Sequence, residues 1–468
     1  MSVKVIAGVV VVVAVAAVGG SYVTGSQIEK GFREKLTETF KPVGITVQVV
    51  EYDRGIFGAT ARTQWSLSAR NKSPEVSFTV NHEITHGPLP AVSAFARIRS
   101  EPELPNEVAS VVKSKFGDTP LLVVDSTLGW SGKVSHHFSL PKYEGDEPNL
   151  GKVSWGGVEG NIDLSDHGNR FQVRIGMPGL SINGKVDLQI DNFVLESEQS
   201  RTRQYRSLWV GNSSMGVDKV VFNTGGAPFL SLDNLKLASD AVPKGELVDV
   251  SVGLNAAKLQ VLGKTVEQIG LTHGLENMDA AAVDKLIRVI EELQPDLNAN
   301  LDEQTLQLKQ AQIKQVLLEQ IPALLKRKPA VVLRVQAKFA EGEAKGDLRV
   351  AYVGAGELEK LNPMTDLASE LHFSLPHALI THLIAERQRP KVFEDEDDYD
   401  DDESEDEDID VVERYITALV DVGLIEDNNG TLSIAASFKD GTLGLNGKTL
   451  TMEEAMQLLQ SIAKSGDS

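Results

Sequence analysis

The strongest constraint on the fold is a two-residue alternation of apolar and polar side chains, which recurs from Ile45 to about Val250. Successive side chains of a strand point to opposite faces, so this period indicates half-buried β-strands. Gly, Asn, Asp and Pro residues separate the runs, and Asn183-Gly184 is typical of a two-residue hairpin turn. We therefore expect an α+β fold that is predominantly antiparallel β, with an elongated or sandwich-like β body.

A helical pattern replaces the alternation near residues 279–326, where Asp279 is a suitable N-cap and Pro295 interrupts the apolar period. We expect a helical pair there. Strands return after it, and Pro376 begins a further short helix. The last segment has the pattern of a helix, a hairpin and a final helix.

The amino terminus carries an apolar run, Val5–Val18, that continues to Val23 after a single Lys4. About nineteen apolar residues approach the roughly 20 that span a bilayer. An uncleaved signal-anchor is favoured, and a cleaved signal peptide is the alternative. Residues 5–23 would then hold the chain in a bacterial inner membrane as a single-pass transmembrane helix, with the bulk in the periplasm. An amphipathic helix over residues 24–42 would follow.

Charge and composition exclude several functional classes. The net charge is −21, and residues 394–410 alone contribute fourteen acidic groups. This run is expected to be a disordered insertion, because its like charges repel one another. The sequence holds no cluster of Lys and Arg that would meet nucleic-acid phosphates. The absence of cysteine excludes disulfides and thiolate metal sites.

One segment matches the zinc-binding motif of metalloproteases. His82-Glu83-Ile84-Thr85-His86 matches H-E-x-x-H, which binds zinc when both histidines share a helix face. Here Val76, Phe78 and Val80 alternate into His82, so the segment is predicted to be a strand. Residues four apart on a strand are separated by about 13 Å, too far for one metal ion. We interpret His82, Glu83 and His86 as a decoy and expect no catalytic residue, metal or cofactor.

Other candidate sites are weaker. The acidic run has no glycine, unlike a calcium loop, and His372, His377 and His382 are spaced by five, which does not stack them on one helix face. Several residues are instead typical of structural turns. These turn elements are Gly55, His86, Gly87, Pro88, Asn446 and Gly447.

Short segments along the whole chain resemble the YdgA family of bacterial proteins, a family of unknown function. They are the Gly-Gly-Ser-Tyr end of the apolar run, Tyr52–Phe57, His86–Pro90, and Phe438–Lys448 followed by Met452-Glu453-Glu454. The resemblance implies an inner-membrane anchor, a periplasmic body and self-association. It implies no catalytic residues.

The predicted division of the chain follows from these patterns: signal-anchor 1–23, amphipathic helix 24–42, β-rich region 43–278, helical insert 279–327, β/α region 328–390, acidic insertion 391–410, and carboxy-terminal region 411–468. Three hypotheses for function remain. The first is a non-enzymatic binding or scaffold protein of the envelope, with a lipid or another envelope protein as ligand and a hydrophobic groove as one version. The second is a self-associating structural protein, a homo-oligomer. The third is a zinc metallohydrolase.

Overall fold

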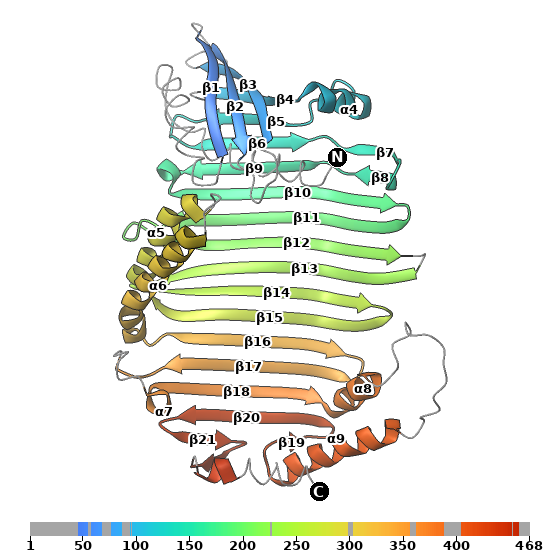
Figure 1. Ribbon diagram of the computed structural model, residues 1–468, viewed down its shortest axis with the longest axis vertical. Helices are drawn as coiled ribbons and strands as arrows, with labels where there is room; N and C mark the ends of the chain where they lie inside the picture. Colours follow the sequence, from blue (N-terminus) through green and yellow to red (C-terminus); the bar gives the residue numbers. More distant parts are fainter. Residues whose placement is uncertain are drawn as a thin grey trace. The chain divides into compact units, whose positions relative to one another are not determined.

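The structure is a computed structural model, shown in Figure 1. It describes residues 45–54, 58–67, 76–86, 94, 96–224, 227–297, 303–355, 362–387, 404–451 and 453–457. The predicted signal-anchor and amphipathic helix lie outside these residues. In the part of the chain that is described, no helix combines the length and the apolar composition that a membrane span requires.

The chain divides into two compact units. Unit 1 comprises Met1–Leu230, Ala238–Glu246 and Ala280–Gln320, and unit 2 comprises Ser231–Leu237, Leu247–Asp279 and Ile321–Ser468. Strand β13, Ala227–Lys244, contributes residues to both units.

Unit 1 contains an antiparallel sheet in which most strands pair with their neighbours in sequence. The order is β1-β2-β3-β4-β5-β6-β9-β10-β11-β12, and the β7–β8 hairpin joins through β8 to β10. The strands are β1 Ile45–Arg54, β2 Gly58–Leu67, β3 Val76–His86, β4 Ala96–Glu103, β5 Val123–Leu128, β6 Val134–Leu140, β7 Tyr143–Glu147, β8 Gly151–Trp155, β9 Val158–Ser165, β10 Arg170–Asn183, β11 Val186–Arg201 and β12 Trp209–Thr224.

Two apolar clusters form the core of unit 1. The first lies on β1–β4 around Val47 and Trp65, and the second lies on β5, β6 and β9 around Phe138 and Ile162. In β9 every second residue from Val158 is buried, which is the alternation that the sequence predicted. Burial of these aliphatic and aromatic side chains is the main favourable contribution to the stability of unit 1.

The strands of unit 2 are also antiparallel, and they pair in the order β14-β15-β16-β17-β18-β20-β21-β22, with the short β19 paired to β20. The strands are β14 Leu247–Val261, β15 Lys264–Asp279, β16 Ala330–Phe339, β17 Gly342–Tyr352, β18 Leu367–Pro376, β19 Glu426–Asp427, β20 Thr431–Lys439, β21 Thr442–Leu445 and β22 Lys448–Leu450. The predicted antiparallel β class is confirmed for both units.

The helices differ from the prediction in two places. They are α4 Asn106–Phe116, α5 Ala280–Leu297, α6 Glu303–Lys326, α7 Pro363–Asp366, α8 His377–Arg387 and α9 Ser404–Asp421. Helix α4 lies inside the region predicted to be β-rich, where no helix was expected. Helix α9 begins at Ser404, within the run predicted to be disordered. The rest of that run, residues 394–403, lies outside the described residues.

In the middle of several long strands, a residue with left-handed φ interrupts the two-residue alternation of side chains. We call this interruption a slip. In β11, Asn192 has a left-handed φ of 49°, and the β10–β11 and β11–β12 registers continue unchanged on both sides of it. Apolar side chains then follow a spacing of three, from Ile190 to Phe193. Met177 and Trp155, which lie beside opposite sides of the slip, both pack against the second cluster of unit 1. The slip therefore keeps the apolar side chains on one face.

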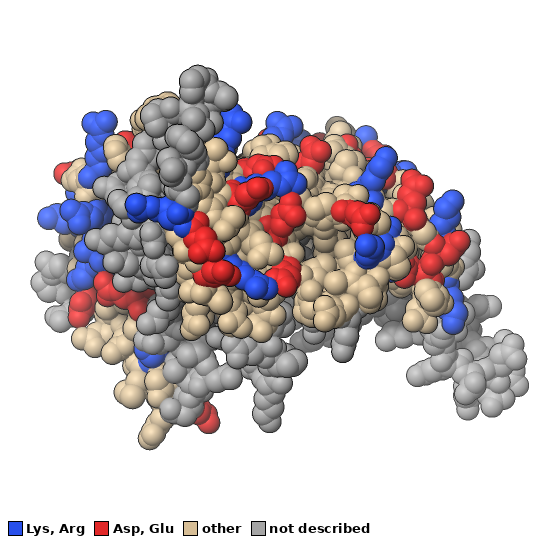
Figure 2. Space-filling model, turned by 90° about the horizontal axis from the view of Figure 1, so that it is seen from above, with Lys and Arg blue, Asp and Glu red and all other residues tan. Residues whose placement is uncertain are grey.

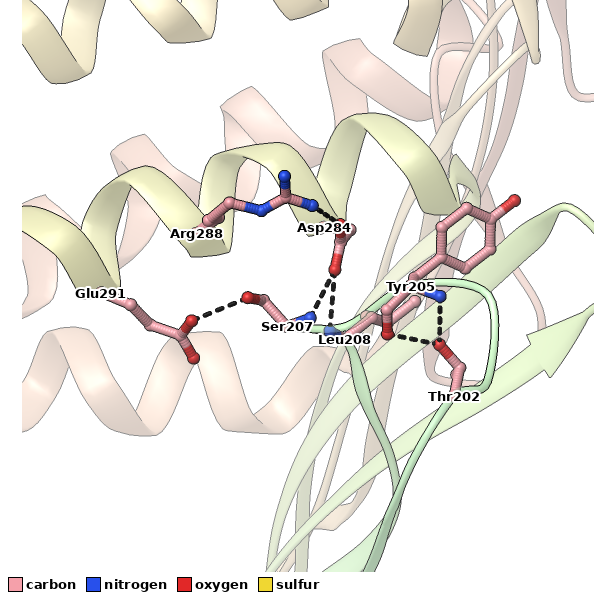
Figure 3. Close-up of polar contacts among 7 residues, drawn as sticks. All are labelled: Thr202, Tyr205, Ser207, Leu208, Asp284, Arg288 and Glu291. Carbon is pink, nitrogen blue, oxygen red and sulfur yellow. Dashed lines mark hydrogen bonds and ion pairs between the residues drawn. The ribbon is translucent and has the colours of Figure 1, made fainter. Parts of the chain in front are cut away.

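The first turns of α5 are fastened to the turn between β11 and β12 (Figure 3). The Asp284 carboxylate accepts hydrogen bonds from the backbone N–H groups of Ser207 at 2.6 Å and Leu208 at 3.1 Å, and from Arg288 at 2.5 Å. The Ser207 hydroxyl donates to Glu291 at 2.7 Å. Since Asp284 is buried, its carboxylate supplies acceptors that water cannot supply.

We expect Asp284→Ala to destabilise unit 1 by about 3 kcal/mol, because it leaves two buried backbone N–H groups without an acceptor. Urea unfolding followed by tryptophan fluorescence measures this unit alone, since all four tryptophans, Trp65, Trp130, Trp155 and Trp209, belong to it. The exposed Glu292→Ala on the same helix is the control and should not move the midpoint. Equal midpoints for both variants would contradict the fastening role of Asp284.

Candidate functional site

The H-E-x-x-H segment lies on strand β3, Val76–His86, with His86 as its last residue. His82 is buried toward the core of unit 1, whereas Glu83 is exposed on the opposite face. The side chain of His86 lies outside the described set. Among the residues that the structure describes, no three His, Asp or Glu side chains are grouped as metal ligands.

His82 is instead held by two hydroxyl groups from neighbouring strands. Its Nε2 lies 2.8 Å from Thr63 Oγ1 on β2, and its Nδ1 lies 2.8 Å from Ser100 Oγ on β4. The Trp65 indole N–H also donates to Thr63 Oγ1, at 2.7 Å. Burial lowers the pKa of His82 to about 4, so the imidazole is neutral near pH 7.

His136 is a second buried histidine. Its Nδ1 lies 2.7 Å from Ser126 Oγ, and burial lowers its pKa to about 4, against the opposing attraction of Asp163. Its Nε2 has no hydrogen-bond partner among the residues that the structure describes. His137, the next residue, points to the other face of β6 and contacts Asn161. Both buried histidines therefore have a structural role in the interior of unit 1.

The other predicted histidine and turn positions lie apart from one another. His372 lies on β18, His377 Nε2 is 3.0 Å from a Glu413 oxygen, and His382 Nδ1 is 3.5 Å from Glu341. Gly55, Gly87 and Pro88 lie outside the described residues.

Asn446 and Gly447 connect β21 to β22 with left-handed φ values of 47° and 78°. The Asn446 side chain accepts from the Ala435 N–H at 2.8 Å and donates to the carbonyl oxygens of Gly423 and Leu424. This residue thus ties the turn to β20 and to the end of α9, a structural role.

The feature that sequence reasoning missed is an apolar face on the sheet of unit 2. Because directly opposite residues of antiparallel strands share a face, the registers define three rows across β14, β15, β16, β17, β18 and β20. The first row is Leu254, Leu271, Val335, Gly346, Phe373 and Ile434. The second is Val252, His273, Leu333, Leu348, Leu371 and Ala436. The third is Val250, Leu275, Val331, Val350, Ser369 and Phe438. We call these eighteen positions the apolar face.

The apolar face is open to solvent. Six of its large side chains are between 37% and 45% exposed: Val252, Leu254, Leu271, Val331, Val335 and Phe373. Gly346 lets two of them approach, since a Cβ there would lie 2.8 Å from Val335 Cγ2 and 3.1 Å from Phe373 Cδ2. At about 4.8 Å between strands and 3.4 Å per residue, the face measures roughly 24 Å by 14 Å. The largest apolar patch of a typical monomer is about 300–600 Å² and is often functional, and this face lies at the lower end of that range.

The opposite face of the same strands is polar. Arg334 and Asp347 form an ion pair at 2.8 Å, and Arg349 pairs with Glu276 at 3.1 Å. The same face also buries the side chains of Ala330, Val332 and Ala351, so the exposed apolar surface lies on the other side of the strands.

Charges of both signs are mixed on the surface drawn in Figure 2, where Lys and Arg side chains lie among Asp and Glu side chains. Among the described residues on that face, no one-signed surface forms that would attract a polyanion.

Comparison with known proteins adds a family. The sequence model of a family described as "Bacterial protein of unknown function (DUF945)" matches residues 2–453. The chain is 20% identical to Protein YdgA of Escherichia coli (strain K12), over 96% of this chain and 94% of the relative. It is 22% identical to the uncharacterized protein YihF of the same organism, over 96% and 97% of the two chains. No solved structure matches the chain.

Proposed function

This chain belongs to the DUF945 family of bacterial proteins, and on that premise we propose that it is a non-enzymatic envelope protein that binds acyl chains on the apolar face of unit 2. The observation that carries the proposal is a six-strand face whose leucine and valine side chains are exposed to water.

The composition of the face favours an acyl chain over a protein partner. Protein interfaces form about one hydrogen bond per 100–200 Å², and their strongest contacts come from Trp, Tyr and Arg. The eighteen positions include none of these three residue types and only two polar side chains, His273 and Ser369. Aliphatic rows of this kind match the uniform surface of a hydrocarbon chain.

The dimensions also favour a lipid over a second copy of the chain. A stable dimer buries about 800 Å² on each partner, whereas the face measures roughly 24 Å by 14 Å, well under half of that area. An acyl chain is about 15 Å long, half the thickness of a bilayer core, so it fits along one row. The expected anchor at residues 5–23 would hold the chain at a membrane, which is a supply of acyl chains.

Photo-crosslinking of the full-length chain in a Gram-negative bacterium tests the proposal. A p-benzoylphenylalanine placed at the position of Val335 lies on the apolar face, and one at Gln336 lies on the opposite face of the same strand. After irradiation, mass spectrometry of the purified protein is expected to find adducts of lipid mass at Val335 and not at Gln336.

Other outcomes would decide against the proposal. A covalent dimer at Val335 in place of lipid adducts would assign the face to self-association. Adducts of equal yield at both positions would indicate non-specific exposure to membrane lipid, and the absence of any adduct would leave the face without a ligand.

A further inference from the structure

The apolar face carries one ionisable side chain, His273, among its eighteen positions. His273 lies on β15 directly opposite Val252 on β14 and Leu333 on β16. Along its own strand, Leu271 and Leu275 precede and follow it on the same face. An imidazole is thus enclosed on four sides by aliphatic side chains, with its remaining side open to solvent.

His273 differs from the histidines that support the fold. His82 and His136 are buried against hydroxyl groups, and His377 lies 3.0 Å from Glu413. Among the described residues, the His273 ring makes no hydrogen bond or ion pair, so water satisfies its two nitrogens while the face is bare.

A hydrocarbon chain lying across the middle row would remove that water. A buried imidazole without a hydrogen-bond partner is unfavourable, so a ligand that covers the row must bring a polar atom to His273 or avoid it. An acidic head group meets this requirement best, because an imidazole N–H that donates to an ionised carboxylate or phosphate oxygen makes a charge-assisted hydrogen bond.

We infer that His273 binds the acidic head of the acyl ligand, a carboxylate or a phosphate, while the chain extends across β16, β17, β18 and β20. This inference rests on the proposed function and specifies its ligand class. The path from β15 to β20 crosses four strand spacings, about 19 Å, which is enough for one extended acyl chain. His273 then fixes the direction in which the ligand lies.

Binding of single-chain probes to the full-length protein, held in an amphipathic polymer, tests the inference. The probes are hexadecanoate, monohexadecanoyl glycerol phosphate and the uncharged hexadecanol. Wild type is expected to bind at least one acidic probe about tenfold tighter than hexadecanol, the contribution of one charge-assisted hydrogen bond. The acidic probe that binds tighter identifies the head group as carboxylate or phosphate.

Substitutions separate recognition of the head from recognition of the chain. His273→Ala should bind all three probes with the affinity of hexadecanol, and His273→Lys, which restores an N–H donor, should regain the preference. The control is His372→Ala, an exposed histidine on the polar face of β18. It should keep the wild-type preference.

The two proposals fail in different ways. If wild type and His273→Ala bind every probe with equal affinity, the face binds acyl chains but His273 does not bind the head group. This result would overturn the inference. If hexadecanol and both acidic probes fail to bind wild type, the proposed function itself fails.

Discussion

Replacing Val335 by Asp is expected to abolish acyl-chain binding, a loss of more than about a hundredfold, while leaving the fold intact. A chain that extends from His273 along the middle row borders the first row, so it would strip water from the new carboxylate, and removing an ion from water without a partner costs several kcal/mol. Val335 is 37% exposed, so the same carboxylate stays hydrated in the unliganded protein. Exposed substitutions of this kind alter stability by about 0.5 kcal/mol or less.

The matched control is Gln336→Asp, which introduces the same charge one residue further along β16 on the polar face. It should retain both hexadecanol binding and lipid adducts. Binding of the probes and thermal melting followed by circular dichroism measure the two effects separately. If Val335→Asp binds hexadecanol as wild type does, the apolar face is not the acyl site.

The apolar face shows what the sequence could and could not predict. In the segment Ala330–Phe339, Val331, Leu333 and Val335 recur at every second position, and the β-branched residues favour a strand. The alternation was predictable from Leu333 onward, whereas the apolar Val332 is buried on the opposite face. The alternation is the same whether a face is covered by a second layer or open to water. The exposure of this face depends on how elements distant in sequence pack, and no local pattern contains that information.

The slips inside the long strands could be predicted only in part. Asn192 is a residue type that tolerates left-handed φ, and the apolar spacing changes from two to three beside it. Gln268 adopts the same left-handed φ in β15, although glutamine gives no such signal. The register of the neighbouring strands imposes this conformation, so it is a tertiary effect.

The H-E-x-x-H motif could be recognised as a decoy because the evidence against it, the strand alternation, lies in the same segment of sequence. Alternation from Val76 places His82 on the same face as Val80 and Ile84, and the strand β3 agrees with it. The partners of His82, Thr63 and Ser100, come from β2 and β4, and their identification requires the sheet register. The sequence therefore predicted a buried histidine position without predicting what satisfies it.

These buried histidines lead to the second large effect: unit 1 should lose stability as the pH falls from 6.5 toward 4. The pKa of His82 and of His136 is about 4 in the folded chain, compared with 6.5 for an ordinary histidine. Between these values the unfolded chain binds more protons, so protons favour unfolding. The stabilising contribution is fully present above pH 6.5 and is lost as the pH falls through that window.

At pH 5 the expected loss is about 2 kcal/mol for each histidine, or about 4 kcal/mol for the pair, relative to pH 7.5. Most carboxylates titrate near pH 4, below both pH values compared, so they contribute little to the difference in stability. Urea unfolding of the full-length chain at the two pH values, followed by tryptophan fluorescence, reports on unit 1. The double variant His82→Gln, His136→Met should show nearly the same midpoint at both values, whereas His137→Gln, the exposed neighbour, should keep the wild-type difference. A wild-type midpoint that does not change between pH 7.5 and 5 would show that these imidazoles remain hydrated in the folded chain, because only desolvation keeps them neutral at pH 5.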